Sequence, residues 1–461
     1  MPAATPMLEQ YHRAKRAHPD AIVMFRLGDF YEMFYEDAEV ASRLLDIALT
    51  ARGRGTGNEA PMCGVPYHAA DGYVARLVGA GHRVALCDQV EDASRAKGLV
   101  RREVVRVVSP GLMTDPGSLD ARTPLFLASI CRTSDRVGCA YADLSSGDLR
   151  VAEAPLARAA ESLAIQFVAF RPREILLPEG EDADGLLPPS AAEPPIPVTR
   201  APAWMFGEDS ALRTLTTTLR TGTLAGFGWT DSGAAVRAAG ALLMHLGETQ
   251  KSRLDHFTRL RPFLPSEHLI LDETTVRTLE IVAGMRDGKR EGTLLAVLDR
   301  TVTPMGARLL RSWLVAPSTD VALIDARQGA VAELAASPSK REDLRSALRG
   351  VRDVERILGR LAIGTAGARD LVALRDSLGA LPVLAGVRDG LSAPALRRAP
   401  SDEDLLEDVE ALIRGAIADE PAPTLHDGGL VRDGHDAALD ELRAISRNGR
   451  AYIAEIETRE R

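Results

Sequence analysis

The sequence is poor in cysteine and in long apolar runs, and each shortage argues against a class of protein. Its 461 residues include 4 cysteines, too few for a disulfide framework, so we expect a reducing, cytoplasmic environment. No apolar run reaches about 18 residues, which argues against a membrane span. Residues 1–20 contain no apolar core, which argues against a signal peptide. There is no Cys-x-x-Cys pair and no His-x-x-x-His spacing, so we expect no metal site.

Positive charge is also in short supply. Lys and Arg number 56 against 65 Asp and Glu, giving a net charge of −9. Residues 1–115 are nearly neutral, with 14 basic and 15 acidic residues. A protein that binds nucleic acid through its overall field is usually basic. If nucleic acid is the partner, local patches of the surface must make the contact.

The hydrophobic pattern predicts a multidomain chain. Mixed helix and strand signals over residues 1–112 predict an α+β domain, and the Pro- and Gly-rich residues 113–124 predict a linker. From Leu125 to about Gly207 the pattern has period two and predicts a three-stranded meander, within an α/β domain expected over residues 125–250. Helical periodicity from Ala211 onward predicts an all-α core over residues 251–461. The individual elements expected are strands at 21–25, 81–87, 101–108 and 174–177, helices over 36–49, 156–167 and 304–316, and a surface loop over 186–202.

The most unusual local sequence is residues 26–35. Four aromatic side chains fall within six residues, in a chain that is only 4% aromatic: Phe30, Tyr31, Phe34 and Tyr35. One interpretation is that all four pack in a domain core. Acidic residues interrupt the run, however, and Gly28 supplies a turn that could lift one side chain clear of the core.

A projecting aromatic side chain can act as a wedge between stacked bases. Unstacking a base step costs a few kcal/mol, and least where pairing is already defective, so a wedge detects mismatches. A carboxylate beside the wedge repels phosphates, which weakens binding to all DNA and sharpens discrimination if one hydrogen bond at the defect offsets it. Burial near a polyanion should raise the pKa of that carboxylate and let it donate to a base nitrogen.

Residues 28–32 and 34–38, Gly-Asp-Phe-Tyr-Glu and Phe-Tyr-Glu-Asp-Ala, resemble the Phe-x-Glu motif of the MutS family of DNA mismatch repair proteins. Any one such stretch is weak evidence for the family, but a set of stretches in the same order along the whole chain is specific evidence. Further stretches that resemble the family lie at 5–11, 49–53, 61–68, 107–111, 301–306 and 427–429.

The resemblance implies roles for individual residues. Phe30 would stack on the mispaired base from the minor groove, and Glu32 would hydrogen-bond that base. Arg52 and the loop 61–68, with Met62, Tyr67 and His68, would lie near the DNA backbone. Electrostatics alone adds Arg54, Arg101 and Arg102, which could equally be ordinary surface arginines.

The resemblance also implies mismatched or looped duplex DNA, a homodimer and downstream repair proteins as partners, with ATP and Mg²⁺ as cofactors of the intact protein. This sequence has no P-loop. Residues 284–290 have one residue too few between the glycines and Arg in place of Ser or Thr, so we expect a charged loop there, with no catalytic residue and no cofactor in this chain. The pattern of residues 437–461 ends without a helix stop signal. We therefore expect the N-terminal portion of a MutS protein without its clamp and ATPase domains.

Two alternatives stay open. Residues 141–148 resemble the first hairpin of ribonuclease H-like folds, in which an Asp on this strand helps to hold magnesium, so Asp143 with Asp148 and Glu174 could form a nuclease site. Fold alone does not imply that function. The chain could instead be a helical interaction scaffold, although the presence of Phe30 and Glu32 argues for mismatch reading.

Overall fold

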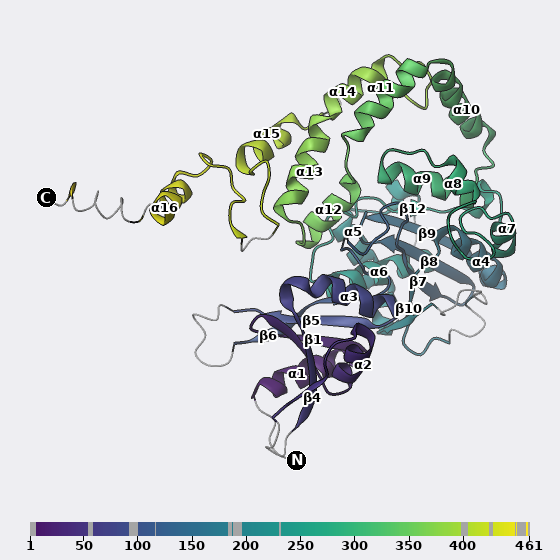
Figure 1. Ribbon diagram of the computed structural model, residues 1–461. Helices are drawn as coiled ribbons and strands as arrows, with labels where there is room; N and C mark the ends of the chain where they lie inside the picture. The colour runs from purple at the N-terminus through teal and green to yellow at the C-terminus, as the bar shows by residue number, and fades with distance from the viewer. Residues whose placement is uncertain are drawn as a thin grey trace. The chain divides into compact units, whose positions relative to one another are not determined.

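The computed structural model describes residues 6–53, 59–91, 100–115, 117–182, 187, 196–229, 232–397, 404–423, 427–447, 449 and 458–459 (Figure 1). The chain divides into two compact units, Met1–Val321 with Leu358–Gly364, and Ala322–Ile357 with Thr365–Arg461. The first unit contains two six-stranded sheets, and the second is built from helices. The multidomain organisation expected from the sequence is therefore confirmed.

The N-terminal sheet is mixed and has the strand order β3-β4-β2-β1-β5-β6. β1 pairs parallel with β5, and the other neighbours pair antiparallel. Helix α1 covers one face, and α2 with α3 covers the other, because alternate residues of β1 point to opposite sides (Figure 1). The elements are α1 Pro6–Ala17, β1 Ala21–Leu27, β2 Phe30–Phe34, α2 Tyr35–Leu45, β3 Thr50–Arg52, β4 Ala60–Pro66, α3 Ala70–Gly79, β5 Arg83–Gln89 and β6 Arg102–Val108.

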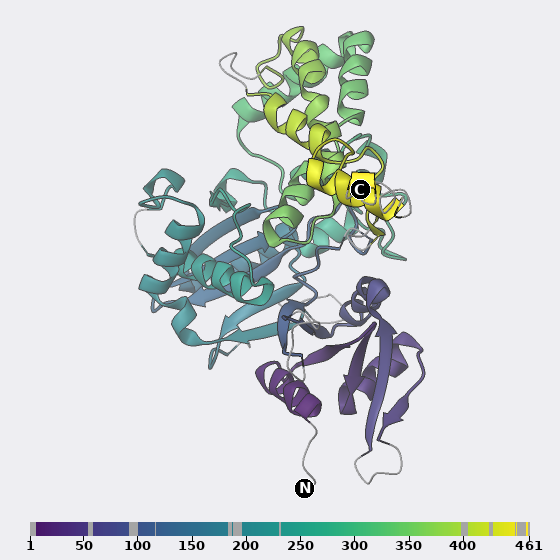
Figure 2. The same cartoon turned by 90° about the vertical axis from the view of Figure 1, so that its left-hand side faces the viewer.

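The second sheet has the order β11-β10-β7-β8-β9-β12. The predicted meander is present as the antiparallel strands β7, β8 and β9, while β10 pairs parallel with β7 and β11. Figure 2 shows teal helices lying over the blue strands of this sheet. The elements are β7 Leu127–Arg132, β8 Arg136–Asp143, β9 Asp148–Pro155, α4 Ala159–Phe170, β10 Glu174–Pro178, β11 Val198–Ala201, α5 Glu208–Thr218, α6 Ala234–Gln250 and β12 Arg261–Pro262.

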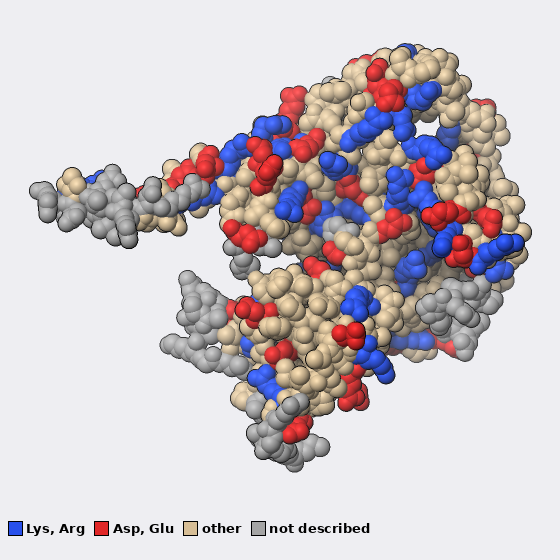
Figure 3. All heavy atoms as spheres, viewed as in Figure 1, with Lys and Arg blue, Asp and Glu red and all other residues tan. Residues whose placement is uncertain are grey.

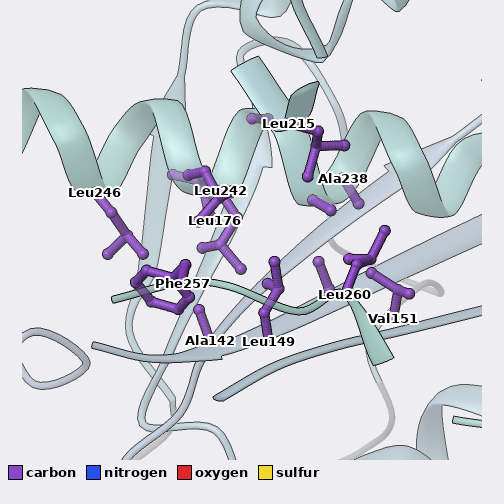
Figure 4. Packing of buried hydrophobic residues seen from close by; sticks show 14 of the residues in the cluster. Ala142, Leu149, Val151, Leu176, Leu215, Ala238, Leu242, Leu246, Phe257 and Leu260 are labelled. Atoms are coloured by element: carbon purple, nitrogen blue, oxygen red, sulfur yellow. The ribbon is translucent and has the colours of Figure 1, made fainter. Parts of the chain in front are cut away.

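Helix α6 is almost fully buried against the second sheet. Leu242 and Leu246 pack on Leu149 and Leu176, with Phe257 closing the same cluster (Figure 4). This close approach depends on small residues. A Cβ at Gly138 on β8 would lie 2.0 Å from the backbone of Ala234, and a Cβ at Gly240 would lie 2.3 Å from Cα of Ala211. Glycine therefore lets α6 pack directly on the sheet and on α5.

Two predictions about local structure need correction. The helix expected over 36–49 ends at Leu45, because Asp46 takes a left-handed conformation with φ of 53°. The Pro-rich stretch expected to be only a surface loop contains β11, which satisfies its backbone by pairing with β10. Helices α5 and α6, which lie within the residues expected to form the α/β domain, pack their apolar faces against the second sheet.

The remaining helices of the first unit are short. Thr303 caps α9 by accepting a hydrogen bond from the Gly306 backbone, and Pro304 is its first residue, as predicted. Val276, Ile281, Leu295 and Val315 form a small core with residues of α4. The elements are α7 Glu273–Thr278, α8 Leu294–Leu298 and α9 Pro304–Val315.

The second compact unit is helical, as the periodicity predicts. Its core contains Ile357, Leu374, Leu378 and Ile413, from helices α12, α13 and α15. The last predicted helix is described only in part, as α16. The elements are α10 Val321–Ala336, α11 Pro338–Arg349, α12 Val354–Ile363, α13 Ala368–Gly379, α14 Leu381–Asp389, α15 Glu407–Ala416 and α16 Ala437–Arg447.

Candidate nucleic-acid interface

A tight hairpin presents Phe30 to solvent. β1 and β2 are joined by Gly28 and Asp29, and Leu27 pairs directly with Phe30. Gly28 has φ of 59°, a conformation that glycine adopts without strain, so the turn expected at this position is present. Phe30 is the first residue of β2 and is 47% exposed. Sheet pairing on both sides of β2 therefore fixes the backbone that carries an exposed aromatic ring.

The other three aromatic residues of the cluster have different surroundings. Phe34 is fully buried against Tyr11, with ring centroids 5.1 Å apart. Tyr31 is buried on the opposite face and donates a hydrogen bond of 2.8 Å to Asp88. Tyr35 is partly buried and stacks on His12. The interpretation that all four form a core is thus wrong for Phe30 alone.

Glu32 lies on the same face of β2 as Phe30, because side chains alternate along a strand. Its side chain is 18% exposed, and its carboxylate pairs with Nη1 of Arg52 on β3 at 3.1 Å. Burial raises the pKa of Glu32, and the charge and hydrogen bond of Arg52 oppose that shift. The face therefore runs from buried Phe34 through half-buried Glu32 to exposed Phe30.

The loop 61–68 is attached to this hairpin. The backbone N–H of Tyr67 donates a hydrogen bond of 2.9 Å to the carbonyl of Asp29. The guanidinium of Arg26 lies 3.7 Å from the centre of the Tyr67 ring. His68 is exposed beside Tyr67, whereas Met62 packs in the core with Phe34. Arg26 and Asp29 thus hold the loop beside the wedge, a role that residue type alone did not indicate.

The predicted backbone arginines differ in how available they are. The Arg52 side chain is 46% exposed, and Arg101 is exposed and paired with Glu103 at 3.1 Å. Arg102 donates to the carbonyls of Arg26 and Val100, so its guanidinium serves to tie β6 to β1. Arg54 lies outside the described residues. Basic and acidic side chains are interspersed over the visible face, in agreement with the net charge (Figure 3).

Comparison with known proteins agrees with this geometry. Family models of MutS domain I, MutS domain II and MutS domain III match residues 5–116, 125–258 and 274–460. The chain belongs to the MutS family. The resemblance drawn from the motifs is therefore confirmed, and the chain carries MutS domains I, II and III in order. The boundaries predicted at residues 112, 124 and 250 stay predictions.

Three relatives are named DNA mismatch repair protein MutS. The one from Symbiobacterium thermophilum is 44% identical over 459 residues, which cover 99% of this chain and 52% of the relative. The one from Solibacter usitatus is 44% identical over 467 residues, covering 100% and 53%. The one from Methanothrix thermoacetophila is 41% identical over 460 residues, covering 99% and 51%. The chain spans about half the length of these MutS relatives.

The carboxylates of the nuclease alternative lie in MutS domain II and are engaged in internal hydrogen bonds. Buried Asp143 accepts from the Leu125 N–H at 3.0 Å and from the hydroxyl of Ser145 at 2.6 Å. Asp148 pairs with Arg150, and buried Glu174 accepts from Thr199 at 2.5 Å. Within the described ranges, no group of three His, Cys, Asp or Glu side chains could hold a metal ion. These contacts favour a structural role for Asp143.

Residues 284–290, where the sequence predicts a charged loop, are all described by the structure. Between α7 and α8, the N–H of Gly284 donates to the carbonyl of Lys289 at 2.7 Å, and Asp287 accepts from the Lys289 N–H at 3.0 Å. These hydrogen bonds close residues 284–290 into a turn, so the loop expected between two helices is present. Among the described helices of this MutS chain, none is long and apolar enough to span a membrane.

Proposed function

We propose that this chain reads mispaired or unpaired bases in duplex DNA to initiate mismatch repair. The observation that supports the proposal is the exposed ring of Phe30, held by a sheet beside the half-buried carboxylate of Glu32. Phe30 enters the minor groove and stacks on the defective base step, where unstacking costs least. Glu32 then hydrogen-bonds the displaced base.

The surroundings of the wedge suit the DNA backbone. Arg52, His68 and Arg101 are exposed on the same domain, and Tyr67 is fixed to the hairpin by Asp29. Arginine contacts to phosphate supply affinity without sequence information. Glu32 opposes that attraction at every site, so that binding is retained mainly where the base contact offsets the repulsion.

The test measures equilibrium binding of the chain to a matched duplex and to the same duplex with one unpaired base. Binding is detected by fluorescence anisotropy at low salt. Stacking of a base on an aromatic side chain contributes about 1–3 kcal/mol, so Phe30→Ala should reduce the preference for the unpaired base at least about five-fold. Trp204→Ala is the matched control, because Trp204 is an exposed aromatic residue of domain II. An undiminished preference in Phe30→Ala would overturn the wedge assignment.

The resemblance to longer MutS proteins extends the proposal. We infer from the family that a longer MutS protein forms a dimer, contacts downstream repair proteins and couples DNA binding to ATP and Mg²⁺. Residues 284–290 form a closed turn, so we expect no ATP binding there. Calorimetric titration of ATP into this chain is expected to give no heat of binding. A saturable heat would contradict that assignment.

A further inference from the structure

Glu32 and Arg52 are bound to each other, although the proposed function assigns one to a base and the other to the DNA backbone. We propose that Arg52 is a positioning residue that holds the Glu32 carboxylate in the absence of DNA and releases it when a backbone phosphate takes the guanidinium. This inference rests on the proposed function. It makes base reading by Glu32 depend on prior contact with the backbone.

The sheet makes the ion pair possible. β3 and β2 are separated by β4, and Glu32 pairs in register with Gly64 of β4. A Cβ at position 64 would lie 3.5 Å from Cγ of Glu32 and 3.3 Å from the carbonyl oxygen of Tyr31. The missing side chain at Gly64 therefore leaves Glu32 room to lean across β4 toward Arg52.

The two partners differ in freedom. The Arg52 side chain is 46% exposed and the Glu32 side chain is 18% exposed. The long, exposed arginine can rotate to a new partner, whereas the short carboxylate is held by the central strand β2. A phosphate is an anion that guanidinium binds with two parallel hydrogen bonds. Phosphate and carboxylate are both anions and repel each other, so they do not bind the Arg52 guanidinium together at close range. When the phosphate binds, the guanidinium therefore moves away from Glu32.

The exchange changes what Glu32 can do. In the ion pair the carboxylate accepts a hydrogen bond from Arg52, which lowers the pKa of Glu32 against the rise caused by burial. Once Arg52 leaves, its lowering effect is lost and the pKa of Glu32 rises further, toward the protonated form that can donate a hydrogen bond to a base nitrogen. Arg52, which adds affinity for the DNA backbone, thus also controls Glu32. Glu32 accepts a hydrogen bond within the protein while Arg52 is bound to it, and donates one to the base after Arg52 has left.

A double-mutant cycle tests the exchange in the full chain. Dissociation constants for matched duplex are measured for wild type, Glu32→Gln, Arg52→Ala and the double variant. If DNA binding breaks the ion pair, Glu32→Gln should tighten DNA binding more in the wild-type background than in the Arg52→Ala background. The two effects should differ by about two- to five-fold, the usual range for a partly exposed ion pair. Equal effects of Glu32→Gln in both backgrounds would overturn the exchange.

Two further measurements separate the outcomes. In the DNA-free protein, carboxyl titration by NMR should give a higher pKa for Glu32 in Arg52→Ala than in wild type, and an unchanged pKa would overturn the pair itself. The exposed pair Arg158 and Glu161, 2.9 Å apart on domain II, is the matched control and should show no coupling to DNA binding. Intact coupling without any preference for an unpaired base would overturn the proposed function alone. No binding of either duplex would overturn both.

Discussion

The hydroxyl of Tyr11 on α1 donates a hydrogen bond of 2.8 Å to Oδ2 of Asp37 on α2. Asp37 is buried, and the same oxygen accepts from the Val23 N–H at 3.0 Å, while Oδ1 pairs with Lys15 at 2.8 Å. One carboxylate therefore joins two helices from opposite faces of the domain I sheet to strand β1. This junction supports the strand pair that carries Phe30.

Asp37→Asn is expected to destabilise domain I by about 2–3 kcal/mol, because an amide cannot accept from all of these donors and leaves buried groups unsatisfied. Tyr11→Phe removes one donor and should cost about 1 kcal/mol. Domain I contains no tryptophan, so hydrogen exchange of the β1 and β2 amides is the suitable measurement. Glu36→Gln, on the exposed side of α2, is the control. Equal protection in Asp37→Asn and Glu36→Gln would contradict the prediction.

A second prediction concerns residues 109–111, which come just before the predicted linker. Buried Glu174 on β10 accepts hydrogen bonds from the hydroxyl of Ser109 and from the N–H of Gly111 at 3.1 Å. A Cβ at Gly111 would lie 3.0 Å from that of Glu174. Glu174→Gln should weaken the structure by about 1–3 kcal/mol and increase hydrogen exchange at residues 109–111.

Gly111→Ala tests the same contact by a steric route. It should also release residues 109–111 while leaving the hydrogen bond from Thr199 to Glu174 in place. Gly180→Ala is a poor control because its φ is 81°, so Gly79→Ala, where a Cβ meets nothing within 4 Å, is preferred. If Gly111→Ala exchanged no faster than Gly79→Ala, close packing at this point would not matter.

The third prediction is a pH dependence that arises in α6. Burial, aided by the charge of Arg83, lowers the pKa of His245 to about 4. The unfolded chain takes up a proton near pH 6.5, whereas the folded chain does so only near pH 4, so this group reduces stability as pH falls between those values. The loss amounts to about 3 kcal/mol by pH 4.

His245→Leu should therefore lose less stability than wild type between pH 6.5 and pH 4. Nε2 of His245 has no hydrogen-bond partner among the described residues, so replacing the ring with an apolar side chain breaks no hydrogen bond of that atom. Urea unfolding followed by tryptophan fluorescence reports on this region, because Trp229 packs against the same core. Parallel pH profiles of the two proteins would show that the pKa of His245 is the same in the folded and unfolded states, which would contradict the prediction.

Much of this protein could be predicted from local pattern. Period-two alternation identified the meander β7 to β9, and the Thr303-Pro304 pair identified the start of α9, because strand faces and helix caps depend on neighbouring residues. The aromatic cluster with Gly28 indicated that one ring could project from the core, and the resemblance to the MutS family singled out Phe30 and Glu32. Each of these signals depends only on residues that lie close together in the sequence.

Contacts between distant segments were decided only by the tertiary structure. Pairing with β10 made part of the Pro-rich stretch into strand β11, and the absence of a side chain at Gly138 lets α6 pack directly on the second sheet. The same holds for the site. The sequence alone determined that an aromatic and a carboxylate stand two residues apart, whereas the sheet decided that Phe30 is exposed, that Gly64 faces Glu32 and that Arg52 reaches its carboxylate. Burial and ion pairing are properties of neighbours in space, and residue spacing along the chain does not specify those neighbours.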